Sequence, residues 1–306
     1  MRAWLVNTTW RTWAMLISFL WLGFALRLFR IAYQSVWWDE GFSVEVSSRD
    51  IFDISLANAA DIHPPFYYYI LHYWMPLAGQ SEFSIRFLST IFSMLLIALI
   101  YKVGRRWLSP HLAALAAFIA TVAPFYIDYS QEARMYTLET LTTLASTYLF
   151  YLLLPKGPAL GSRPSSKDVR GLWASYLLIT AVSLYIDYFP ALTIVFQNMF
   201  VAAWWLFNLW TGRGPTARLA TIRADWTALR PFLWRWIASQ AVILALYIPW
   251  LWVGFRQIAG YGLGNVSAPT LDAQLERLWR TFTLGETIEP WPAAIFLAIA
   301  VAIFLA

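Results

Sequence analysis

Two adjacent acids, Asp39 and Glu40, have side chains that could perform general acid or base chemistry. They follow two tryptophans at the end of an apolar run and precede Gly41. Acids at the edge of a membrane core are costly unless they are solvated or paired, so their presence needs an explanation. We expect Gly41 to permit an unusual backbone path that aims a carboxylate into a cleft. Because neighbouring residues on an irregular segment point in different directions, we also expect Asp39 and Glu40 to have different tasks.

A second group of chemically useful residues lies in the segment 128–136, D-Y-S-Q-E-A-R-M-Y. Asp128 or Ser130 could cap the helix that follows. Arg134 lies in the first turn of that helix, where the helix dipole disfavours a cation. An anion should therefore accompany it. The anion is either Glu132 in an ion pair or a bound phosphate, for which a guanidinium beside a helix N-terminus is a natural site.

One histidine and two further arginines complete the candidate residues. His63 precedes two prolines and an aromatic helix start, where an imidazole can face a site or cap the helix. Arg27 and Arg30, at the end of the first apolar run, are explained by snorkelling to lipid headgroups. Cofactor use stays open: His63 and Glu132 could bind a divalent metal, but no tight ligand spacing such as H-E-x-x-H occurs.

The composition places most of the chain in lipid. Of its 306 residues, 60% are hydrophobic and 13% are charged, whereas a soluble domain has roughly 25% charged residues. The absence of cysteine excludes disulfides, thiol catalysis and cysteine-ligated metals. The formal net charge of +5 does not indicate nucleic acid binding, because in a membrane protein the charges must first be sorted by side.

Apolar runs long enough to cross a bilayer recur along the chain, since about 20 residues span its core. We predict about eight spans, at 13–31, 84–103, 112–127, 135–154, 172–189, 191–210, 232–253 and 291–306. The last run is short for a span, so we expect the transmembrane module 1–306 to be truncated at its C-terminus. The predicted fold class is an all-α polytopic membrane protein.

The distribution of charge predicts which ends of the spans face outward. Lys and Arg concentrate in alternate loops, which favours a cytoplasmic N-terminus. Of all the acids, only Asp168 and Asp225 then lie on the cytoplasmic side. The two long outer loops, 32–83 and 254–290, each carry a segment that we expect to form an interfacial helix. Any chemistry is therefore expected on the outer side.

Four motifs occur in an order that resembles a known family. They are W-W-D-E-G-F-S at 37–43, H-P-P at 63–65, S-E-F-S-I-R at 81–86 and Y-S-Q-E-A-R-M-Y at 129–136. Together they resemble bacterial glycosyltransferase family 39 of the GT-C superfamily, which is similar to the protein O-mannosyltransferases and the lipid A aminoarabinose transferases. The resemblance covers about the first 150 residues closely and the rest only as a hydropathy pattern.

The resemblance implies a GT-C type helix bundle in the plasma membrane with its active site on the extracytoplasmic side. Such an enzyme transfers a hexosyl or pentosyl group from a polyprenyl phosphate to an acceptor hydroxyl of a protein, lipid or glycan. Asp39 matches the family's catalytic acid, and Arg134 matches a basic residue that would hold the donor phosphate. Roles in substrate binding or orientation are implied for four further residues: Glu40, His63, Glu132 and Tyr136.

We expect this reaction to invert the anomeric centre, with Asp39 as general base. A retaining double displacement needs two facing carboxylates about 5 Å apart, which the neighbours Asp39 and Glu40 are poorly placed to provide. The alternative function is transport or flipping of a lipid-linked substrate. Transporters tend to bind their substrates near the bilayer midplane, whereas the candidate residues here gather at one outer face. The sequence identifies neither the sugar nor the acceptor.

Overall fold

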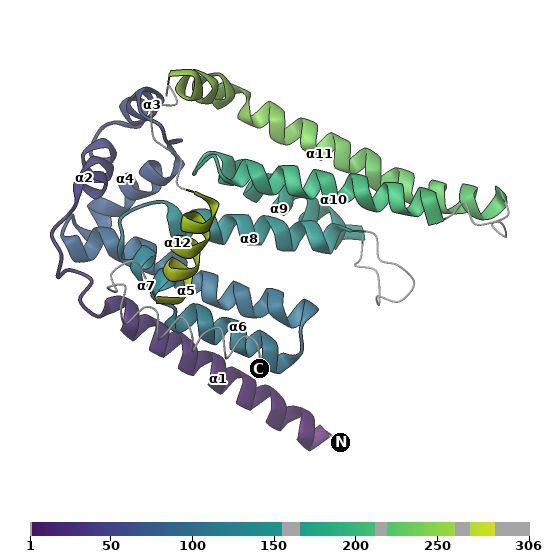
Figure 1. The fold of residues 1–306 in the computed structure, drawn as a ribbon, viewed down its shortest axis with the longest axis horizontal. Helices are drawn as coiled ribbons and strands as arrows, with labels where there is room; N and C mark the ends of the chain where they lie inside the picture. Colours follow the sequence, from purple (N-terminus) through teal and green to yellow (C-terminus); the bar gives the residue numbers. More distant parts are fainter. Residues whose placement is uncertain (1, 155–165, 212–218, 261–269, 285–306) are drawn as a thin grey trace. The chain divides into compact units, whose positions relative to one another are not determined.

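The computed structural model describes residues 2–154, 166–211, 219–260 and 270–284 (Figure 1). Within these ranges the secondary structure consists of α-helices and one short 3-10 helix, η1, with no β-strand. Several of the helices are long and apolar. The prediction of an all-α polytopic membrane protein is thus confirmed. The predicted span at 291–306 lies outside the described residues.

The helices belong to two compact units, which are described separately. One unit comprises Met1–Ser55, Tyr67–Leu141 and Gly260–Ala306, and the other comprises Leu56–Phe66 and Thr142–Ala259. The first unit contains α1 (Arg2–Leu28), α2 (Trp38–Ser47), α4 (Phe66–Ala78), α5 (Glu82–Trp107), α6 (Pro110–Val122), α7 (Pro124–Asp128), η1 (Tyr129–Gln131) and α12 (Leu271–Leu284). The second contains α9 (Ser166–Leu184), α10 (Pro190–Thr211) and α11 (Leu219–Gly260). Helices α3 (Ile51–Ala60) and α8 (Tyr136–Leu153) are divided between the two units, while α4 and α11 each have only one end residue, Phe66 and Gly260, in the other unit.

Several described helices meet the length and hydropathy required to cross a membrane. They are α5, the part of α10 over Pro190–Phe207 and the part of α11 over Arg230–Gln257. The pair formed by α6 and α7–η1 qualifies as one broken span with a bend of 59°. In contrast, the two predicted outer loops contain the shorter helices α2, α3 and α4 and, in the second loop, α12. Helices therefore occur where interfacial helices were predicted.

Arg27 holds the bend between α6 and α7. Pro124 has no N–H to donate at this break, so carbonyls at the end of α6 lack their usual helical partners. The fully buried Arg27 side chain donates to the carbonyl oxygens of Ala120 and Thr121, at 3.0 Å each, and to Ser93 Oγ of α5 at 2.7 Å. The expectation that Arg27 snorkels to headgroups is wrong, because the negative end of α6 holds the cation inside the bundle.

Helices α1, α5 and α6 lie side by side around this arginine (Figure 1). Close packing of their backbones is possible because small residues occupy the contact. A Cβ atom at Gly104 of α5 would lie 3.1 Å from the Cβ of Ala113 in α6, which is tighter than ordinary contact. The second unit instead has an aromatic core, in which Phe150, Tyr176 and Trp236 are buried between α8, α9 and α11.

We predict that Arg27→Met lowers the free energy of unfolding by about 2 to 6 kcal/mol, because two buried carbonyls then lose their donor at roughly 1–3 kcal/mol each. The measurement is thermal unfolding of the purified protein in detergent. The matched control is Arg30→Met just beyond the end of α1, where the side chain is exposed and the change should stay within about 0.5 kcal/mol. Equal melting of wild type and Arg27→Met would contradict the structural role.

Candidate active site

A buried ion pair between Glu40 and Arg86 fixes the start of the segment 32–83 against α5. Glu40, in the first turn of α2, is fully buried. Arg86 donates from Nε to Oε1 at 2.8 Å and from Nη2 to Oε2 at 2.6 Å, a bidentate geometry. Its Nη1 and Nη2 groups also donate to the carbonyls of Ile31, Gln34 and Ser35. The pair therefore joins α2, α5 and the linker that follows α1.

The same carboxylate orders the irregular segment that precedes α8. Glu40 Oε1 accepts a hydrogen bond from the N–H of Ala133 at 2.8 Å. From α5, the hydroxyl of Ser89 donates to the carbonyl oxygen of Arg134 at 3.2 Å. A buried segment outside regular structure needs partners for its backbone polar groups. Here α2 and α5 supply them. These hydrogen bonds to the backbone of Ala133 and Arg134 fix the place of the Arg134 side chain.

Asp39 and Arg134 meet beside this buried arrangement. Arg134 Nη2 lies 4.0 Å from Asp39 Oδ2, and the side chains are 2% and 39% exposed respectively. Arg134 Nη1 donates to the carbonyl of Asp39 at 3.3 Å, to Ser43 Oγ at 3.2 Å and to the Tyr68 hydroxyl at 3.4 Å. The Tyr136 ring centroid lies 5.9 Å from Arg134 Cζ. A solvent-accessible carboxylate thus stands next to a buried cation.

The two acids have different partners, as predicted, but the backbone between them is regular. Asp39, Glu40 and Gly41 all lie in the first turn of α2. A Cβ atom at Gly41 would approach only Val36 Cγ1, at 3.9 Å. The expectation of an unusual backbone path at Gly41 is therefore wrong. The rotation of about 100° between successive residues of a helix separates the two carboxylates instead.

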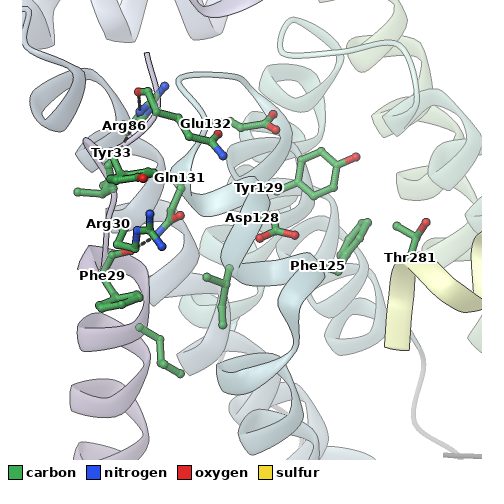
Figure 2. Close-up of a pocket in the computed structure, with 14 residues that line it drawn as sticks. Phe29, Arg30, Tyr33, Arg86, Phe125, Asp128, Tyr129, Gln131, Glu132 and Thr281 are labelled. Carbon is green, nitrogen blue, oxygen red and sulfur yellow. Dashed lines mark hydrogen bonds between the residues drawn. The ribbon is translucent and has the colours of Figure 1, made fainter. Parts of the chain in front are cut away.

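A cavity of about 580 Å³ lies beside the ion pair and the end of α1 (Figure 2). Its charged and polar lining includes Arg30, Asp128, Gln131 and Glu132, with Thr281 of α12 at its edge. Figure 2 shows the Tyr33 and Tyr129 side chains among these groups. Arg86 also borders the cavity, whereas Asp39 and Arg134 are not part of its lining. The mixed polar and aromatic wall suits a hydroxylated ligand.

Glu132 has the most perturbed carboxyl group of this region. Burial, together with the nearby charge of Glu40, raises the pKa of Glu132 to about 7, while Arg134 opposes the shift. A carboxyl group whose pKa lies near neutrality can gain or lose a proton at physiological pH. Glu132 lines the cavity and also interacts electrostatically with Asp39 and Arg134.

The structure brings five predicted site residues into one unit: Asp39, Glu40, Glu132, Arg134 and Tyr136. His63 belongs to the other unit, where its Nδ1 lies 3.1 Å from Asp61 Oδ2. Among the residues that the structure describes, no group of three His, Cys, Asp or Glu side chains is arranged to hold a metal ion. A joint role of His63 and Glu132 in metal binding stays a prediction.

Three residues of the site were not singled out from the sequence: Ser43, Tyr68 and Arg86. Arg86 carried the same signal as Arg134, because a cation near the predicted start of a helix is disfavoured by the dipole and calls for an anion. The expectation that Arg134 lies in the first turn of a helix is wrong, since α8 begins only at Tyr136, and Arg86 is the fifth residue of α5. Ser43 carried no such signal, since a serine hydroxyl inside a helix commonly donates to a backbone carbonyl of the preceding turn. It does so here as well, donating to the carbonyl of Asp39 at 2.8 Å.

Residues 62–160 match the family model of dolichyl-phosphate-mannose-protein mannosyltransferases. No curated protein matches the chain. The matched range contains Arg86, Glu132 and Arg134, while Asp39 and Glu40 precede it and join it through the contacts described above. Together with the apolar helices, the match indicates a multi-pass membrane protein of the glycosyltransferase type, resembling mannosyltransferases.

We predict that Glu40→Gln lowers the free energy of unfolding by about 3 to 5 kcal/mol, because the Arg86 charge is then buried without its counter-ion. Thermal unfolding in detergent measures the change. In the same helix, Glu45→Gln removes an exposed pair with Arg49 and should cost at most about 1 kcal/mol. The double variant Glu40→Gln/Arg86→Met should recover part of the loss; a double variant less stable by the sum of both single losses would contradict the pairing.

We predict that Glu132→Gln stabilises the protein at about pH 8 relative to wild type but not at about pH 5. The folded-state pKa is raised, so the stability contribution of Glu132 is complete below its unfolded value of about 4.5 and is lost as the pH rises through about 7. Melting temperatures at both pH values measure the effect. Exposed Glu45→Gln is the control, and an equal shift at both pH values would contradict the assignment.

Proposed function

We propose that the protein is an inverting glycosyltransferase that moves a sugar from a polyprenyl phosphate to an acceptor hydroxyl on the extracytoplasmic side of the membrane. The observation that carries the proposal is the pair formed by the partly exposed Asp39 carboxylate and the buried Arg134 guanidinium, 4.0 Å apart. The family match over residues 62–160 supports the reaction type. The resemblance of the four sequence motifs to bacterial glycosyltransferase family 39 extends this support to Asp39.

In the proposed reaction, Asp39 accepts the proton of the acceptor hydroxyl while that oxygen attacks the anomeric carbon of the sugar. A bond forms between the acceptor oxygen and the anomeric carbon, and the bond to the phosphate oxygen breaks. The polyprenyl phosphate leaves as an anion and needs no proton from the enzyme. General-base assistance of this kind contributes about 10²- to 10⁴-fold to the rate.

Arg134 supplies positive charge where negative charge develops on the leaving phosphate. Its Nη1 already has three acceptors within the protein. At 4.0 Å, the separation of Nη2 from Asp39 Oδ2 exceeds hydrogen-bond length. We assign the edge of the guanidinium that faces Asp39 to a phosphate oxygen, because the 39% exposed Asp39 side chain marks the accessible side of the buried cation. Because Nη1 donates to the Asp39 carbonyl, Ser43 Oγ and the Tyr68 hydroxyl, the charge is oriented before substrate binds.

The contacts of Glu40 with Arg86 and Ala133 favour the inverting route. A retaining enzyme needs a second carboxylate facing the first at about 5 Å, but the oxygens of Glu40 are taken by Arg86 and Ala133. We assign Glu40 to positioning Asp39 and Arg134. To Glu132 and Tyr136 we assign contacts with the substrate. We also propose that His63 takes part in substrate binding and that the protein lies in the plasma membrane.

We predict that Asp39→Asn lowers turnover by at least about 10²-fold, because the amide cannot accept the hydroxyl proton. Release of polyprenyl phosphate from polyprenyl-phosphate mannose, with a panel of hydroxyl acceptors, measures the reaction of the purified protein. Asp53→Asn changes an exposed acid in α3 and should leave turnover unchanged. Melting temperatures show that the variants are folded. Wild-type turnover by Asp39→Asn would overturn the role of Asp39, and no donor consumption by wild type with any acceptor would count against the function.

A further inference from the structure

A second cavity, of about 730 Å³, lies between α1 and α5, with Pro110 at the start of α6 also in its lining, and shares no lining residue with the first cavity. Each helix contributes five lining residues with the spacing i, i+1, i+4, i+5 and i+8, beginning at Thr12 in α1 and at Ile97 in α5. This spacing marks one continuous face of a helix over two turns. The cavity is therefore a groove along the two helices, about 12 Å long at 1.5 Å rise per residue.

The groove changes from apolar to cationic along its length. The walls at one end are aliphatic and include Leu20 and Ile97. At the other end lie Trp13 and Tyr101, followed by Lys102 and Arg105 near the end of α5. Tryptophan and tyrosine occur at the membrane interface, where an aromatic ring sits at headgroup level. The aliphatic, aromatic and cationic parts of the groove thus follow the same order as the acyl chain, glycerol region and headgroup of a phospholipid.

We propose that this groove binds one anionic phospholipid, with an acyl chain along the aliphatic walls and its phosphate beside Lys102 and Arg105. Both cations are exposed on the groove side of the last turns of α5. Basic pockets between membrane helices favour anionic headgroups, and each nearby cation adds to the preference. A zwitterionic lipid fits the aliphatic walls equally well but gains less from the two cations. The charge complementarity therefore selects the headgroup.

The test uses the purified full chain and native mass spectrometry with dioleoyl-phosphatidylglycerol or dioleoyl-phosphatidylcholine added at equal concentration. For wild type we expect roughly tenfold preference for phosphatidylglycerol, decreasing with added salt because the charges are near the surface. Lys102→Gln/Arg105→Gln should remove the preference. The matched control is Arg230→Gln/Arg235→Gln, which removes two exposed cations from α11 and should retain it.

A second variant tests the groove itself. Ala98 is an exposed small residue of the α5 wall, and Ala98→Phe should reduce binding of both lipids by filling the space. Three outcomes would overturn the proposal: a preference that survives Lys102→Gln/Arg105→Gln, an equal loss in the α11 control, or binding of neither lipid because another part of the chain occupies the groove. None of these measurements depends on glycosyl transfer, so the proposal stands or fails separately from the proposed function.

Discussion

The bidentate contact between Glu40 and Arg86 is the interaction on which the candidate site depends. One carboxylate neutralises a buried cation and accepts the N–H of Ala133, while the same cation holds the linker after α1. Such a pair adds little net stability over well-packed apolar residues, because desolvation of both charges offsets their attraction. Its effect is geometric. It places Asp39 from one element opposite Arg134 from another, although neither carries a strong contact to the other.

Buried arginines satisfied by backbone carbonyls recur in this fold. Arg27 binds the carbonyls that the α6–α7 bend leaves without donors, and Arg86 binds three carbonyls of the α1–α2 linker. A guanidinium carries five N–H donors in a rigid fork, more than a lysine offers. Irregular backbone is tolerated at membrane depth only where protein groups satisfy it. Arginine therefore permits the α6–α7 bend and the α1–α2 linker of the first unit.

Much of the helical pattern was predictable, because an apolar run of about 20 residues has few alternatives in a bilayer. The positions of α5 and α10 follow from hydropathy in this way. The burial of Arg27 was not predictable, since its acceptors lie 93 and 94 residues away along the chain. In the site, Asp39 and Glu40 have different partners, and their separate tasks stay a prediction. The partner of Glu40 was missed because Arg86 follows it by 46 residues, and spacing rules do not reach across that distance.

The separation of the site along the chain has a consequence for biosynthesis. Arg134 follows Asp39 by 95 residues, and the segment between them includes all of α5 and α6. Because chains are made from the N-terminus, Asp39 and Glu40 emerge while neither of their arginine partners yet exists. The site can form only after α5 and the α6–α7 pair have been inserted. A nascent chain therefore carries unpaired acids outside its first helix until the later helices arrive.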